Sequence, residues 1–172
     1  MEQSAKPSDV LLVTTHGHTA CVRVEGRATF KVSGSLKKFI LGAADSGTTR
    51  VILDMDHCIA MDSTFMGVLA GIAMQFQAGD RHLMLINLHA ETVSLLETLG
   101  LDRLLETHTP LTTEAALKAE LGVPEDFSKL SASAESDTLQ MILEAHENLI
   151  DASPSNAPKF EDVISYLRKA QA

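Results

Sequence analysis

The hydroxyl and carboxylate side chains best placed for chemistry are Asp62, Ser63 and Thr64, which come just before a long apolar segment. The run 51–53 ahead of them is typical of a buried strand, and the apolar spacing over 63–77 predicts a helix. The unpaired N–H groups and positive dipole end at a helix start favour an anion by up to about 1 kcal/mol. A phosphate on Ser63 would therefore be tolerated, although Asp62 or Ser63 acting only as a helix cap fits the same pattern.

The two residues that follow, Phe65 and Met66, have two interpretations. They form an exposed apolar patch with a polar rim beside Ser63, as protein contact sites often do, or they pack in the core. The pattern alone leaves both open.

Other polar residues give weaker indications of chemistry. Asp54, Asp56 and Asp62 could suggest a Mg²⁺-dependent phosphoacceptor pocket, but the first predicted strand lacks the acidic pair that such a receiver site needs. His16 and His18 lie across a turn with no further ligand at metal-binding spacing. The sequence has no nucleophile elbow, phosphate-binding loop or dinucleotide fingerprint. We therefore predict no enzyme activity, no metal and no cofactor.

The elements that position this segment alternate between strand and helix. An opening hairpin (10–13 and 20–24) turns at Gly17, and apolar runs at 51–53 and 83–86 predict central strands. Helices are predicted over 32–43, 63–77, 91–99 and 112–121, and a short edge strand over 104–108. The order ββαβαβαβα indicates an α/β fold with a mixed sheet.

The composition changes after about residue 125. We predict one domain over 1–125, a Ser- and Ala-rich linker over 126–137, and a C-terminal helical hairpin over 138–172. The hairpin's apolar stripes, one centred on His146 and one opened by Pro158, must be buried on the domain, on a second copy or on a partner. A homodimer through these helices is one of the possibilities. His146 itself is interpreted as a hydrogen-bonded core histidine, with no function assigned.

The overall charge and hydropathy limit the partners. A formal net charge of −9 disfavours nucleic acid and anionic membranes, and no apolar run is long enough for a membrane helix. The polar N-terminal residues lack the apolar block of a secretory signal, so we expect a cytoplasmic protein. Cys21 and Cys58 have no metal or disulfide spacing and are expected to be reduced.

The segment 62–67, Asp-Ser-Thr-Phe-Met-Gly, resembles the helix start of the STAS domain of bacterial anti-sigma factor antagonists. That family typically has Asp-Ser-Ser/Thr-Gly-Leu-Gly after an apolar strand, and the element order over about 10–123 agrees with its fold. The resemblance implies a partner switch, in which an anti-sigma factor or serine kinase binds the unmodified protein and phosphorylation of Ser63, or as second choice Thr64, releases it. Our candidate partner-binding residues are Asp62, Ser63 and Thr64 of this motif, the apolar pair Phe65 and Met66, and Thr29.

Three features depart from that family. Phe65 stands where the family has glycine, Thr29 where the best-known members have an acidic residue, and the helices beyond about 137 have no counterpart in the minimal domain. The alternative is therefore a non-phosphorylated STAS scaffold or transport-complex module that binds partners through its helices. A third hypothesis is a sensor that binds a small anion at the same helix start.

Overall fold

The fold is taken from a computed structural model, which describes residues 8–113, 126–130 and 138–172. Its strands are β1 (Val10–His16), β2 (Thr19–Ala28), β3 (Arg50–Asp54), β4 (Cys58–Met61), β5 (His82–Ile86), β6 (Glu106–Thr107) and β7 (Ser128–Lys129). Its α-helices are α1 (Phe30–Asp45), α2 (Ser63–Gln77), α3 (Ala90–Thr98), α5 (Thr138–Ala152) and α6 (Ala157–Ala170). Two short 3₁₀ helices, η1 (Leu101–Arg103) and η2 (Pro154–Asn156), complete the described elements.

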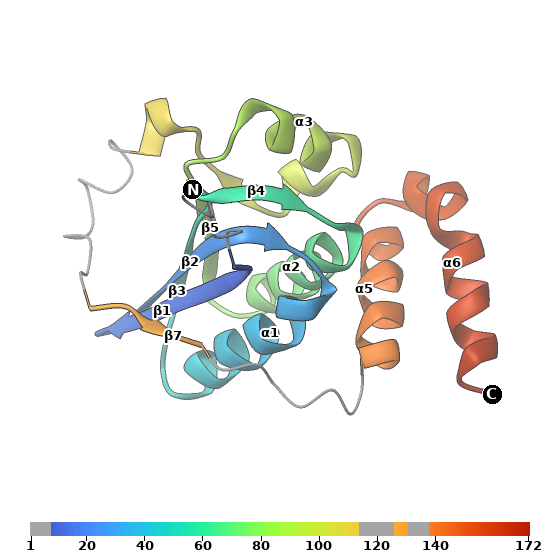
Figure 1. The fold of residues 1–172 in the computed structure, drawn as a ribbon, viewed down its shortest axis with the longest axis horizontal. Coiled ribbons are helices and arrows are strands. Elements are labelled where there is room, and N and C mark those ends of the chain that lie inside the picture. The colour runs from blue at the N-terminus through green and yellow to red at the C-terminus, as the bar shows by residue number, and fades with distance from the viewer. Residues whose placement is uncertain (1–7, 114–125, 131–137) are drawn as a thin grey trace, which may run out of the picture.

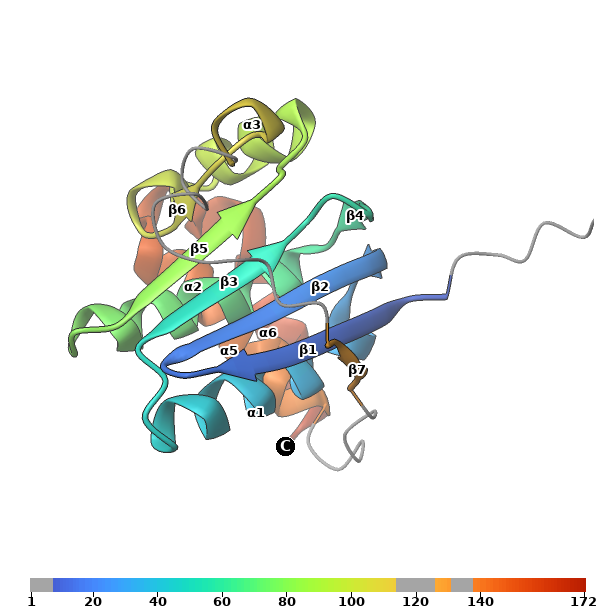
Figure 2. The ribbon, with the colours of Figure 1, turned by 90° about the vertical axis from the view of Figure 1, so that its left-hand side faces the viewer.

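The strands form one mixed sheet in the order β6-β5-β3-β2-β1-β7 (Figure 2). β1 and β2 are an antiparallel hairpin, whereas β2, β3, β5 and β6 pair in parallel. β4 pairs with the far end of β2 beyond a shift in register. This confirms the predicted α/β fold with a mixed sheet, its opening hairpin and its edge strand near residue 106.

The helices on one face of the sheet lie in successive layers (Figure 1). α1 and α2 cover the sheet, α5 lies on α2, and α6 lies outermost against α5. The main core is built from the apolar strand residues and the inward faces of α1 and α2, and it continues into α5 through Ala145 and Leu149. A separate cluster of Leu143, Ile164 and Leu167 joins α5 to α6.

The C-terminal helices are present as predicted, and the apolar face of α5 packs on the domain itself. Pro158 lies in the first turn of α6, where a missing N–H is tolerated. The loop between the two helices is fixed by the fully buried Asn156, whose side-chain N–H₂ donates to the carbonyl oxygens of Leu99 and Leu149 at 2.9 and 2.7 Å.

Some elements differ from the sequence prediction. β4 was not predicted, because it is four residues long and exposes Ile59 and Ala60 rather than showing an alternating pattern. β7 lies within the predicted linker and pairs with β1. Of the helix predicted over 112–121, residues 110–113 begin a helix, and the rest lies outside the described residues. Within the described ranges, no helix has the length and hydropathy needed to cross a membrane.

Candidate functional site

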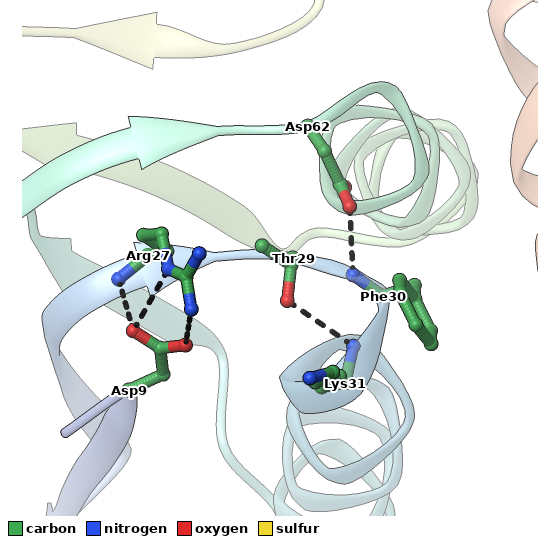
Figure 3. Close-up of polar contacts among 6 residues, drawn as sticks. All are labelled: Asp9, Arg27, Thr29, Phe30, Lys31 and Asp62. Atoms are coloured by element: carbon green, nitrogen blue, oxygen red, sulfur yellow. Dashed lines mark hydrogen bonds and ion pairs between the residues drawn. The ribbon is translucent and has the colours of Figure 1, made fainter.

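Two helices begin at the same corner of the molecule, and one carboxylate caps both. Asp62 precedes α2 in extended conformation, and its Oδ1 accepts the backbone N–H of Phe65 at 2.8 Å. Its Oδ2 accepts the N–H of Phe30, the first residue of α1, at 2.9 Å (Figure 3). A carboxylate here satisfies unpaired N–H groups and favourably faces the positive end of both helix dipoles.

Ser63, the first residue of α2, does not act as the cap. Its Oγ lies 2.9 Å from Nε2 of His146 in α5. The other ring nitrogen, Nδ1, lies 2.8 Å from the carbonyl oxygen of Ile142. Because a carbonyl oxygen only accepts, Nδ1 donates to it, and in the tautomer with the proton on Nδ1 alone Nε2 is an acceptor for the Ser63 hydroxyl.

This serine–histidine pair lies beneath the C-terminal hairpin. His146 is 4% exposed, and its ring meets the edge of Phe160 from α6 at a centroid distance of 5.3 Å. Ser63 is partly buried. The predicted phosphoacceptor therefore begins the expected helix, but α5 covers it.

Below this pair, α2 and α5 approach until their backbones touch. Gly67 has no room for a side chain, because an added Cβ would overlap the backbone carbonyl of Ala145. An added Cβ at Gly71, one turn later, would overlap the side-chain amide of Asn148. That amide also donates to the carbonyl oxygen of Gly67 at 3.3 Å. We call this surface of α2, from Ser63 through Gly67 to Gly71, the α2 groove.

Three other predicted site residues, Thr64, Phe65 and Met66, are buried and so cannot contact a partner in this conformation. Phe65 and Met66 are 0% and 3% exposed and belong to the main core, so of the two interpretations the structure supports core packing and not an exposed patch. Thr64, the second-choice acceptor, is buried at 5%. Nearly all of α2 is covered because the sheet lies on one side and α5 on the other, which leaves no apolar residue of its first turns to a partner.

Thr29 lies at the same corner as Asp62, as the N-cap of α1 (Figure 3). Its hydroxyl accepts from the N–H of Lys31 at 3.4 Å, a long bond. Next to it the Asp9 carboxylate accepts the Arg27 backbone N–H at 2.9 Å and its guanidinium at 3.2 Å. These bonds from Arg27 lower the pKa of Asp9. Thr29 is thus partly exposed at a corner that also carries basic side chains.

The acids considered for a Mg²⁺ pocket do not converge. Asp54 accepts from the Asn87 side chain at 2.9 Å and lies 3.6 Å from Arg23, while Asp62 caps the two helices elsewhere. In the part of the chain that the structure describes, no three His, Cys, Asp or Glu side chains gather as a metal site would require.

Sequence reasoning missed the part of His146 in this site. The histidine was recognised on the apolar stripe of α5, but its partner lies 83 positions earlier, and nothing local indicates that pairing. The glycine spacing at 67 and 71, inside an otherwise apolar helix, was the one available signal for a close helix contact.

The mixed sheet, its opening hairpin and a serine at the start of α2 define the class of protein: a STAS-type α/β domain. The chain belongs to the STAS domain family, whose model matches residues 11–116, more than half of the sequence. The match ends before α5, which begins at Thr138.

Solved anti-sigma factor antagonists share this fold. Unphosphorylated SpoIIAA matches with a TM-score of 0.54 and 16% identity, over 66% of this chain and 99% of its own. Phosphorylated SpoIIAA from Bacillus gives 0.51 and 18%, over 64% and 99%. The antagonist from Mycobacterium paratuberculosis gives 0.54 and 17%, over 64% and 95%. No curated protein matches the sequence significantly.

Proposed function

We propose that this chain is a signalling protein of the anti-sigma factor antagonist type, which binds an anti-sigma factor, a serine-kinase-like protein or a scaffold through the Ser63 corner and is controlled by phosphate on Ser63. The observation that carries the proposal is the place of the Ser63 hydroxyl at the first residue of α2, beside the shared Asp62 cap. It is supported by the family membership and by neighbours solved with and without phosphate.

The effect of a phosphate follows from the contacts of Ser63. Phosphorylation adds about −1.5 to −2 charges and three acceptor oxygens. The hydrogen bond between the Ser63 hydroxyl and His146 is lost, because Oγ and Nε2 are only 2.9 Å apart and a phosphoryl group does not fit between them. A partner surface shaped for the hydroxyl, whether apolar or acidic, loses affinity for the same reasons.

A second candidate function rests on the coverage of Ser63. Because α5 lies over the serine and His146 satisfies its hydroxyl, Ser63 also fits a purely structural part. The protein would then be a STAS scaffold or transport-complex module that binds partners through its helices. Exposed apolar side chains on α6, with Tyr166 72% and Val163 40% exposed, favour this alternative.

The test is affinity isolation from native-host extract with four full-length baits: wild type, Ser63→Ala, Ser63→Asp and, as a charge control, Ser165→Asp on the exposed side of α6. Bound proteins and the phosphorylation state of Ser63 are identified by mass spectrometry. We expect one kinase-like or scaffold partner on wild type, Ser63→Ala and Ser165→Asp, and its loss on Ser63→Asp.

Retention of the same proteins by all four baits, with no phosphate on Ser63 in the host, would contradict the phosphate control. Binding that is lost instead on Tyr166→Ala would then support the scaffold alternative.

A further inference from the structure

Ser63 and His146 have the geometry of a nucleophile and its base. The Ser63 Oγ lies 2.9 Å from Nε2 of His146, a distance at which a base can take a hydroxyl proton. The second ring nitrogen, Nδ1, donates to the carbonyl oxygen of Ile142 at 2.8 Å. In the tautomer with the proton on Nδ1 alone, Nε2 has the lone pair that can receive the serine proton. A serine, a histidine and a third group that orients the histidine form the arrangement that activates serine hydroxyls.

The imidazole ring of His146 is held in place on two further sides. Its edge meets the ring of Phe160 from α6 at a centroid distance of 5.3 Å and an angle of 61° between the ring planes. The histidine is 4% exposed, so bulk water has little access to Nε2. A base that is fixed in position before the reaction does not have to be reoriented during it, which favours proton transfer.

One side of Ser63 stays open to an incoming group. Ser63 is partly exposed, whereas Thr64 is buried at 5%, which favours Ser63 over Thr64 as the phosphoacceptor. Because the hydroxyl proton is directed at His146, a lone pair of Oγ is left on another side for an electrophile. Ser63 is also the first residue of α2, so the positive end of the helix dipole lies near any phosphoryl group that reaches it.

The carboxylates around the pair have other partners. Asp62 accepts the N–H groups of Phe65 and Phe30 at 2.8 and 2.9 Å, and Glu144 on α5 is paired with Lys37 of α1 at 3.3 Å. Among the described residues, the side chain that hydrogen-bonds the Ser63 hydroxyl is His146. The histidine, and not a carboxylate, is therefore the group placed to take the proton.

We propose that His146 is the general base for phosphorylation of Ser63, so that this chain supplies a group that a kinase ordinarily supplies. The phosphoryl donor is a nucleoside triphosphate held by the kinase-like partner. The Ser63 Oγ attacks the γ-phosphorus, the Oγ–P bond forms as the bond to the leaving nucleoside diphosphate breaks, and the hydroxyl proton passes to Nε2. His146 then releases this proton to water. The inference rests on the proposed function, because it takes Ser63 as the phosphoacceptor.

The proposal gives α5 a part in the reaction. His146 lies 83 positions after Ser63 and outside residues 11–116, which the family model matches. Nucleophile and base meet only because α5 packs in the α2 groove, at whose first residue the serine lies. The docked hairpin is therefore the form of the protein that is competent for phosphorylation.

The first test labels the full-length protein with a fluorescent alkyl fluorophosphonate, which reacts with activated serine hydroxyls. The Oγ–P bond forms, the P–F bond breaks and the hydroxyl proton goes to Nε2, as in the proposed reaction. We expect Ser63 to be labelled at least about 100-fold faster than Ser165, an exposed serine on α6, when both are quantified by mass spectrometry in one sample. Labelling of Ser63 no faster than that of Ser165 would overturn the proposal.

His146→Gln distinguishes a base from a merely structural partner. The glutamine side-chain oxygen can accept the Ser63 hydroxyl but does not take up a proton at neutral pH. We expect labelling of Ser63 to slow by about 100-fold or more, whereas His57→Gln, at an exposed histidine, should behave as wild type. Circular dichroism establishes that the variant is folded. Equal labelling of Ser63 in His146→Gln and wild type would show that the histidine only holds the hydroxyl in place, which overturns the proposal.

Labelling of the wild type in D₂O supplies a measurement that does not depend on a variant's folding. If the proton moves to Nε2 as the Oγ–P bond forms, Ser63 should be labelled more slowly in D₂O than in H₂O at matched acidity. Equal rates would contradict general-base catalysis. These assays contain no kinase, so their failure leaves phosphate control of Ser63 intact with the base supplied by the kinase. The bait experiment measures partner release, which labelling does not, so the two proposals can fail separately.

Discussion

The hydroxyl of Ser63 and Nε2 of His146 are hydrogen-bonded at 2.9 Å, which ties the first residue of α2 to the middle of α5. The pair connects the family domain, matched over 11–116, to the added hairpin. Whatever modifies or removes either side chain must therefore change the contact between these two parts of the chain.

Replacing His146 with alanine tests this connection. The change leaves the partly buried Ser63 hydroxyl without its acceptor and opens a cavity beside Phe160, so we expect the free energy of unfolding to fall by about 1–3 kcal/mol. Urea denaturation measures it. His57→Ala, at an exposed histidine, should stay within about 0.5 kcal/mol of wild type. Equal stability of both variants would mean that the pair does not stabilise the fold.

The close approach of α2 and α5 predicts opposite effects for two glycine substitutions. Gly67→Ala should destabilise by about 1–3 kcal/mol, because the obstructing atoms are backbone atoms of Ala145 that move only with α5. Gly42→Ala, in an exposed position of α1 with open space around it, should stabilise by about 0.5–1 kcal/mol through helix propensity. Thermal unfolding of both variants decides the matter, and an increase in stability for Gly67→Ala would contradict the geometry.

The shared cap at Asp62 predicts a larger loss than an ordinary cap. Asp62→Ala removes acceptors from the N–H groups of Phe65 and Phe30 at once, so we expect a loss of about 1–2 kcal/mol in the free energy of unfolding. Thr29→Ala is the matched comparison, since its bond to Lys31 is long and its loss should cost less. Guanidinium denaturation measures the free energy of unfolding of both variants. A larger loss for Thr29→Ala than for Asp62→Ala would contradict the shared cap.

The thiols should resist alkylation in the native protein. Burial raises the pKa of both Cys21 and Cys58, and Asp54 adds to the effect at Cys21, so the reactive thiolate is scarce at neutral pH. Because the thiol pKa values are higher in the folded than in the unfolded chain, the folded protein holds these protons more tightly. The resulting stabilisation is complete below the ordinary thiol pKa of 9.0 and is lost as the pH rises through the folded-state pKa.

Iodoacetamide labelling followed by mass spectrometry should show slow modification of both cysteines at pH 8 and fast modification in denaturant. Native labelling of Cys58 as fast as in denaturant would show that its side chain is not buried.

The charge pair between α1 and α5 predicts an acid-sensitive hairpin. The side chains of Gln140 and then Lys37 lower the pKa of Glu144 from its ordinary value of 4.5. A lowered folded-state pKa stabilises above the unfolded value, and this stabilisation is lost as the pH falls through the folded pKa.

At pH 7, Glu144→Gln should lower the unfolding free energy by about 0.2–1 kcal/mol relative to wild type, and this difference should shrink below pH 4.5. Glu161→Gln, at an exposed site on α6, serves as the control. A difference between wild type and Glu144→Gln that is the same at pH 7 and pH 3 would contradict the expected charge effect.

Most of the fold could be predicted because the spacing of apolar residues along each long helix or strand is typical of that type of element. The apolar runs at 51–53 and 83–86 predicted central strands, and the change of composition after about residue 125 preceded the two C-terminal helices. The helix start at Ser63 followed from local capping chemistry, although Asp62 proved to be the cap. The short strands β4 and β7, of four and two residues, carry too short a pattern to have been predicted.

The candidate site was predicted only in part, since its geometry depends on contacts distant in sequence. Phe65 and Met66 follow a polar triplet, so the pattern allowed either exposure or core packing, and α5 and the sheet enclose that turn from both sides. No local signal indicates that His146 meets Ser63 rather than solvent or another core residue. The division into domain, linker and hairpin stays a prediction, as does phosphorylation of Ser63.

The contact between Gly67 and Ala145 also orders events during protein synthesis. Gly71 is made 74 positions before Ala145, so at about 5–20 residues per second the ribosome needs roughly 4–15 s to supply the helix that covers the glycines. During that interval the nascent domain can complete its sheet while the glycine face of α2 is still uncovered. A chaperone or a partner that meets the chain on the ribosome therefore has access to this surface that it loses once the last helices emerge.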